Sequence, residues 1–178
     1  MDEKEARQRL VDESRKLVGV RYENGSGFVA NPQAAPSSLS CSQFVGIVFA
    51  RVFPQAELKS VLLPQGDPGE SYAHAMWLGL ERLEACEPCR VCRGDLAVYT
   101  CPGPFVFDEH GVPRAWHVML VTSAVLGVIG ACPVARRVLG DTKAGYERRI
   151  EDAGWTFKTY LKCPLEAAGV AGLSVRSG

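Results

Sequence analysis

In the first part of the chain, segments with a helical pattern of hydrophobic positions alternate with polar loops. Residues 2–18 carry apolar side chains near one face and charged side chains elsewhere, and Gly19 follows, so an amphipathic helix is predicted. Residues 23–40 are rich in glycine, proline and serine, which predicts a loop. Residues 41–53 are apolar on most faces and end before Pro54, which predicts a buried helix capped by the serines that precede it.

A third helical pattern covers residues 71–85, and from Gly94 onward short apolar runs alternate with turn residues. These runs predict strands at residues 95–101, 104–107, 116–123, 125–132, 135–139 and 155–161. Helices followed by strands are typical of an α+β domain, here with N-terminal helices packed on an antiparallel sheet of about five or six strands. No linker is visible, so we expect one domain over residues 1–178, helical at about 1–90 and sheet-forming at about 94–165.

One uncharged stretch, residues 115–135, is long enough to span a bilayer. It is rich in β-branched residues and contains His117 and Pro133, which disfavours a transmembrane helix. We therefore predict two buried strands joined near Ser123 and Ala124, and no membrane insertion.

Composition and charge narrow the range of functions. Of 178 residues, 47% are hydrophobic and 22% charged, as in ordinary globular proteins, and 20 basic residues balance 20 acidic ones. This balance argues against a nucleic-acid partner and against a polybasic membrane anchor. The N-terminus is charged and has no apolar segment typical of a signal peptide, so we expect synthesis into the cytoplasm. Nothing in the sequence indicates an oligomeric state.

Cysteine chemistry is the most informative feature. The seven cysteines are an odd number, which leaves at least one thiol outside any set of intramolecular disulfides. Cys41 stands where the polar loop turns into the apolar helix, so its sulfur is expected at a helix N-terminus. Unpaired N–H groups and the helix dipole favour a thiolate there, which would suit a nucleophile. The alternative is a buried structural cysteine.

A cysteine nucleophile needs a base, and the chain has three histidines. His74 lies within a helical pattern and His110 in a turn, whereas His117 opens an apolar strand directly after Trp116. A histidine at the start of a buried strand can be held rigidly against a helix terminus. His117 is therefore the expected base, with a half-buried structural histidine as the alternative.

Four segments in a fixed order resemble the NlpC/p-sixty family of cell-wall cysteine peptidases. They are GVRYENGSGF, SCSQFVGIVFARVF, RGDLAVYT and HVMLV, and the resemblance covers about residues 4–161. It implies a papain-like fold in which Cys41 is the nucleophile and His117 the base. Tyr22 then corresponds to the tyrosine that borders the site and contributes to the oxyanion hole. Ser42 and Ser40 correspond to positions that bind the amino end of the substrate.

Departures from the family pattern bear on catalysis. Gln43 replaces a glycine, and Ser40 stands where many members have an acidic residue. The third catalytic residue of the family, often a histidine, falls at Gly130, which has no side chain to orient the base. Asp141, Thr122 or a backbone carbonyl remain open for this role, and the sequence assigns it to none of them.

The resemblance also implies the substrate. It predicts hydrolysis of an amide in a peptidoglycan stem peptide or muropeptide, between D-glutamate and the diamino acid, without a cofactor. Delivery to the cell wall would then follow a non-classical route, unless the enzyme trims wall fragments in the cytosol or is part of a larger protein. The alternatives are an amidohydrolase or acyltransferase acting on another amide, a non-catalytic pseudo-peptidase, and a zinc-stabilised binding module.

The zinc alternative depends on a cysteine cluster. Cys86, Cys89 and Cys92 recur at three-residue intervals, and Cys101 follows as a possible fourth ligand of a tetrahedral site. However, Cys101 would close a loop that contains a predicted strand, whereas zinc ribbons pair two separate knuckles. The family has no such metal, so we expect none and interpret these residues as free or disulfide-bonded thiols.

Overall fold

The computed structural model describes residues 1–23, 31–54, 80, 82–100, 116–123, 125–165 and 168–170. The α-helices are α1 (Glu3–Arg15), α2 (Cys41–Val52) and α4 (Lys143–Glu151), and a short 3-10 helix, η2, spans Pro88–Arg90. The strands are β1 (Arg21–Tyr22), β2 (Ser38–Leu39), β3 (Ala85–Cys86), β4 (Leu96–Thr100), β5 (Trp116–Val121), β6 (Gly127–Cys132), β7 (Arg137–Thr142) and β8 (Thr156–Leu161). They form one eight-stranded sheet in the order β2-β1-β7-β6-β5-β4-β8-β3.

The predicted α+β class is confirmed, but the sheet is larger than predicted and mixed. Eight strands replace the expected five or six, and β1 pairs with β2 in parallel. The additional strands β1, β2 and β3 have two residues each and precede residue 94, in the part predicted to be helical. Two residues are too few to display an alternating pattern, so only tertiary pairing reveals these strands.

The longer predicted elements are confirmed. The helices α1 and α2 and the strands β4 to β8 lie within or beside the predicted segments. The uncharged stretch forms β5 and β6, joined by a turn, and no helix among the described residues is long and apolar enough to cross a membrane. The predicted strand at 104–107 and nearly all of the predicted helix at 71–85 lie outside the described residues.

The helix α4 was not predicted. Thr142 caps its first turn by accepting a hydrogen bond from the Gly145 N–H, and only Tyr146 and Ile150 of its residues are buried. Two buried positions four residues apart, surrounded by charged residues, make a weak sequence signal. Packing against the sheet stabilises this helix more than its own pattern does.

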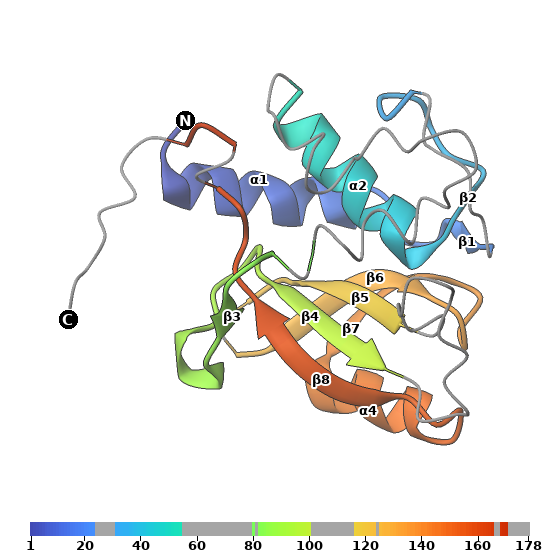
Figure 1. Ribbon diagram of the computed structural model, residues 1–178. Coiled ribbons are helices and arrows are strands. Elements are labelled where there is room, and N and C mark those ends of the chain that lie inside the picture. Colours follow the sequence, from blue (N-terminus) through green and yellow to red (C-terminus); the bar gives the residue numbers. More distant parts are fainter. Residues whose placement is uncertain are drawn as a thin grey trace.

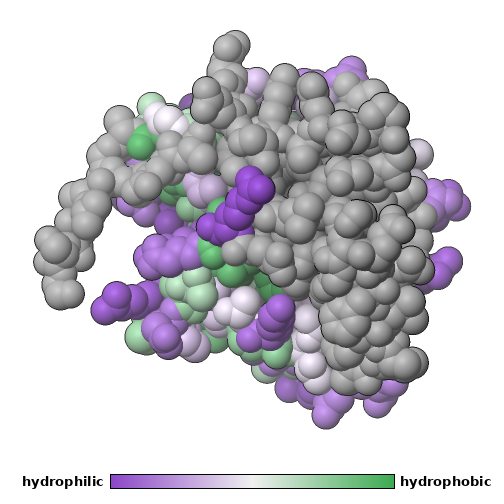
Figure 2. All heavy atoms as spheres, in the orientation of Figure 1, coloured by the Kyte–Doolittle hydropathy of each residue, from purple (hydrophilic) through white to green (hydrophobic). Residues whose placement is uncertain are grey.

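Helices cover both faces of the sheet (Figure 1). The helices α1 and α2 lie on one face and α4 on the other. Side chains of β5 alternate between the two cores: Trp116, Val118 and Leu120 pack toward α1 and α2, whereas Met119 and Val121 pack toward α4. On the face drawn in Figure 2, hydrophilic side chains project around the edge of the described part and apolar ones lie between them.

A buried carboxylate joins α1 to the sheet. Asp95 accepts hydrogen bonds from Arg7 Nη1 at 2.8 Å, from the Cys92 N–H at 2.8 Å and from the Cys163 N–H at 3.0 Å. Gly94 precedes it with φ +88, a conformation that favours glycine, and adopts the tight turn that leads into β4.

Candidate active site

Cys41 is the first residue of α2, as the loop-to-helix transition predicted. Ser40 is the N-cap: its hydroxyl accepts the Gln43 N–H at 3.3 Å, and the Gln43 side chain accepts the Ser40 N–H at 3.0 Å. This reciprocal capping box fixes the direction in which the chain enters the helix. Gln43, a departure from the family pattern, is therefore used to position the residue that precedes Cys41.

The sulfur of Cys41 lies against backbone N–H groups. Burial raises the pKa of the thiol to about 11, and hydrogen bonds from the backbone of Val118, Ser42 and Cys41 itself oppose this shift only in part. The sequence led us to expect a lowered pKa at the helix N-terminus. That expectation was wrong in sign, because removal of the sulfur from water outweighs the favourable N–H groups.

Incomplete strand pairing gives the sulfur access to Val118. β5 pairs with β6 only through Leu120 and Val121, although both strands are fully described. Val118 is not part of this pairing, and its N–H forms a hydrogen bond to the sulfur of Cys41. The N-terminal end of α2 approaches the sheet, while its other end points away from it (Figure 1).

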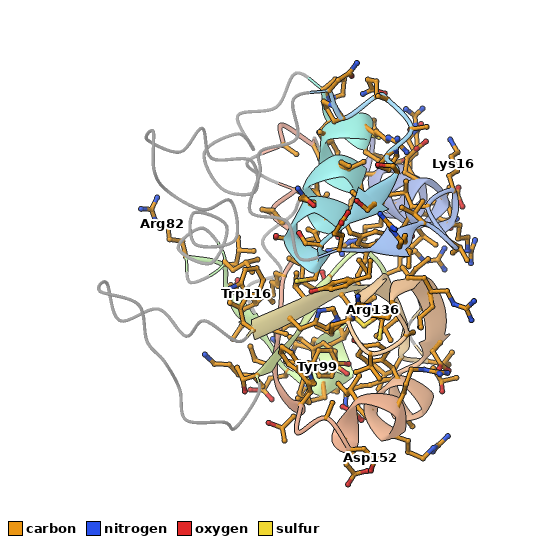
Figure 3. The ribbon with its side chains drawn as sticks, turned by 90° about the vertical axis from the view of Figure 1, so that its right-hand side faces the viewer. Lys16, Arg82, Tyr99, Trp116, Arg136 and Asp152 are labelled. Carbon is orange, nitrogen blue, oxygen red and sulfur yellow. The ribbon has the colours of Figure 1, made fainter. Side chains whose placement is uncertain are left out.

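His117 is buried, with 1% of its surface exposed, on the face of the sheet that α4 covers. Its ring stacks on Tyr146, with 5.8 Å between ring centroids and 22° between planes, and also contacts Tyr99 and Trp155. Figure 3 shows Tyr99 between the sheet and α4. Burial lowers the pKa of His117 to about 3, so the imidazole is neutral at physiological pH.

His117 also makes a polar contact through one of its ring nitrogens. Its Nε2 lies 2.6 Å from the hydroxyl oxygen of Tyr146. Burial raises the pKa of Tyr146 most, followed by Cys132 and by the charges of Tyr99 and Cys41. Cys41 packs with the core on the α2 face, where its sulfur is hydrogen-bonded to the Val118 N–H, whereas the ring of the preceding residue, His117, lies on the α4 face.

Tyr22 also lies near the sulfur. Burial raises the pKa of its hydroxyl to about 12, and the charges of Cys41 and Cys132 add to this shift, whereas Arg136 lowers it. Its place on β1, beside β7, brings a residue from the start of the chain to the site. Tyr22 and Cys41 belong to the same buried cluster, and the oxyanion role of Tyr22 stays a prediction.

The two serines that flank Cys41 are buried and bonded locally. Ser40 and Ser42 are 6% and 1% exposed, and their hydroxyl oxygens lie 3.1 Å apart. In this arrangement both hydroxyls form hydrogen bonds at the N-terminus of α2. Their predicted contact with a substrate amino group stays a prediction.

A side chain at the family's third catalytic position would require Met119 to shift. A Cβ atom on Gly130 would lie 3.1 Å from Met119 Cγ and 3.4 Å from Met119 Cα, so this part of the core is already filled. Of the residues left open for the role, Asp141 pairs with Arg149 and Thr122 lies beside Gly127. Neither is the hydrogen-bonding partner of His117.

Tyr146, which the sequence analysis did not single out, is the residue whose hydroxyl contacts Nε2 of His117. The usable signal was local: Thr142 is a good N-cap, and Tyr146 and Ile150 follow with the spacing of one helical face. Recognition of this helix would have indicated a buried tyrosine. The partner of that tyrosine still depended on the packing of α4 against β5 and β6.

Other predicted candidates fall outside this site. Cys86 is buried, and Cys89 and Cys92 are exposed. Among the residues the structure describes, no three His, Cys, Asp or Glu side chains are arranged to hold a metal ion. Cys101 lies outside the described residues, as do the other histidines, His74 and His110.

Comparison with known proteins supports the fold. No family model matches the chain, and no curated protein matches it by sequence. A solved structure, the peptidoglycan hydrolase RipB from Mycobacterium tuberculosis, is similar with a TM-score of 0.51 and 19% sequence identity. The similarity covers 90% of this chain and 65% of the RipB chain, so the two share a fold over less than two thirds of RipB.

Proposed function

We propose that the protein is a cysteine hydrolase that cuts an amide bond in the peptide stem of peptidoglycan. The observation that carries this proposal is that the Cys41 sulfur is hydrogen-bonded to the N–H of Val118, the residue that follows His117. The nucleophile candidate begins α2 with its sulfur on the Val118 N–H, and the ring of the preceding residue is bonded to Tyr146. A thiol, an imidazole and an orienting group together match the requirements of covalent catalysis.

The resting state in this proposal is a neutral pair. The raised pKa of Cys41 keeps a thiol, and the lowered pKa of His117 keeps a neutral imidazole. Both values oppose proton transfer in the resting state, so in this proposal the thiol proton moves to His117 only as the sulfur attacks the carbonyl carbon. Because Tyr146 occupies Nε2, Nδ1 is the nitrogen that accepts this proton.

The rest of the cycle follows from the same groups. Attack forms a C–S bond and a tetrahedral oxyanion, which the N–H of Cys41 and the hydroxyl of Tyr22 stabilise. His117 donates its proton to the leaving nitrogen as the C–N bond breaks, which leaves a thioester and a free amine. Water then attacks the thioester, His117 takes its proton, and the carboxylic acid and the thiol are released.

Two resemblances support the choice of substrate. The order of four sequence segments matches the NlpC/p-sixty pattern, and the fold is that of a peptidoglycan hydrolase, RipB. On this basis the substrate is a muropeptide or stem peptide, and the bond cut is that between D-glutamate and the diamino acid.

The test is cleavage of purified muropeptides, analysed by mass spectrometry. The reduced wild-type protein is compared with Cys41→Ala and with Cys89→Ala, a control that removes an exposed thiol. Products from the wild type and Cys89→Ala, but not from Cys41→Ala, would support the proposal, and their masses identify the bond. Equal results from all three folded proteins would refute it and favour another amide or a non-catalytic role.

A further inference from the structure

The hydroxyl of Tyr146 lies between a histidine and a cysteine. Its oxygen is 2.6 Å from Nε2 of His117, and it also forms a hydrogen bond with the side chain of Cys132. The Cys132 sulfur in turn accepts the Ala135 N–H at 3.4 Å. All three side chains are buried, so the direction of each proton is set by these neighbours rather than by water.

Counting protons gives a direction to the hydrogen bonds that link His117, Tyr146 and Cys132. A neutral imidazole has one N–H, and the Tyr146 hydroxyl has one proton to donate. Cys132 also bonds to this hydroxyl, and its sulfur is the acceptor that we assign to the O–H proton. The tyrosine oxygen is then an acceptor, so Nε2 of His117 carries the ring proton and Nδ1 has a free lone pair.

We propose that Tyr146 is the positioning residue of this site: it accepts the Nε2 proton of His117 and leaves Nδ1 free to take the thiol proton of Cys41. The inference rests on the proposed function for the identity of the base. It assigns to a helix residue the role that the family pattern places on the strand at Gly130. Cys132 supports the arrangement by accepting the tyrosine proton.

Packing keeps the ring of Tyr146 in place before any substrate binds. It stacks on His117 and meets Tyr99 edge-on, with 5.4 Å between centroids and 63° between planes. No side chain from position 130 competes for the histidine, because Met119 fills that space. A fixed tautomer and ring orientation are what an orienting residue supplies in cysteine and serine hydrolases.

The chain offers a matched pair of variants. Tyr146→Phe removes the hydroxyl that touches His117 and keeps the ring. Tyr99→Phe removes another buried hydroxyl from the same core, one that has no hydrogen-bond partner in the structure. Both remove one oxygen and preserve the stacking, so they differ in the contact with the imidazole nitrogen.

The first readout is the NMR signal of the His117 ring, assigned with His117→Gln. In the wild type and in Tyr99→Phe we expect the ring proton on Nε2, hydrogen-bonded and slow to exchange. In Tyr146→Phe this proton should move upfield and exchange faster. A proton on Nδ1 in the wild type, or a signal that Tyr146→Phe leaves unchanged, would overturn the inference.

The second readout is kinetic. Tyr146→Phe should lower kcat for muropeptide cleavage with little change in KM, by more than tenfold but less than the roughly 10,000-fold loss when a triad carboxylate is replaced. Tyr99→Phe should cleave like the wild type. Equal rates for both variants would overturn the inference and leave the proposed function intact. Absence of cleavage by the wild type, with the NMR difference present, would instead refute the proposed function and the catalytic role with it.

Discussion

The Nε2 atom of His117 lies 2.6 Å from the hydroxyl oxygen of Tyr146, 29 positions later in the chain. One residue comes from a strand and the other from a helix that covers the α4 face of the sheet. A buried imidazole without a partner would destabilise the fold, so this contact satisfies a polar group as well as orienting it. The stability and the proposed chemistry of the site therefore depend on the same hydrogen bond.

The pH dependence of Cys41 alkylation follows from its raised pKa. The thiol titrates at about 11, and the thiolate is the reactive form, so iodoacetamide should label Cys41 slowly at pH 7. The rate should rise about tenfold per pH unit through the alkaline range. Site-resolved mass spectrometry measures it, with the exposed Cys89 as a control for access of the reagent. A rate that levels off below pH 8 would indicate a thiolate–imidazolium pair in the free protein, contrary to our expectation.

His117 should make the fold sensitive to acid. Its pKa falls from 6.5 to about 3 on burial, so between these values the unfolded chain binds a proton that the folded protein does not. The contribution of the neutral His117 to the free energy of unfolding is therefore complete above pH 6.5. It decreases as pH falls toward 3, by up to about 1.4 kcal/mol per pH unit. Urea unfolding from pH 7 to 4 should show a shallower dependence for His117→Gln. Parallel curves for the two proteins would contradict the assignment.

The Asp95 network predicts a large loss of stability on charge removal. Asp95→Asn removes the buried ionic partner of the Arg7 guanidinium, 14% exposed, which keeps its pair with the exposed Glu3. Breaking a buried pair on one side costs about 3–5 kcal/mol. Glu5→Gln removes an exposed ion pair with Arg9 on the same helix and should cost less than about 1 kcal/mol. Urea midpoints measure both, and similar losses would argue against a structural role for Asp95.

Gly130 should not accept the residue that the family pattern places there. Gly130→His would introduce a Cβ 3.1 Å from Met119 Cγ and force the ring into a filled core. Overpacking of this kind costs about 1–3 kcal/mol, and activity should not increase. Gly130→Ala should cost less, because the flexible methionine can adjust. Thermal unfolding and cleavage assays test this, and a stable, more active Gly130→His protein would show that the strand can still supply an orienting residue.

The sequence alone determined the elements whose patterns are long enough to read. The period of apolar positions located α1, α2 and β4 to β8, and the change from polar loop to apolar helix placed Cys41 at an N-terminus. His117 was found because it opens an apolar strand. These conclusions hold because helix and strand periods, caps and turns are local properties of the chain.

The tertiary structure decided the rest of the site. It added the two-residue strands β1 to β3, placed Tyr146 of α4 on His117, and reversed the expected direction of the Cys41 pKa shift. Each of these depends on what packs against a residue from distant parts of the chain. Strand pairing, hydrogen-bond partners and the desolvation of a thiol arise only when those parts meet, so a local pattern carries no information about them.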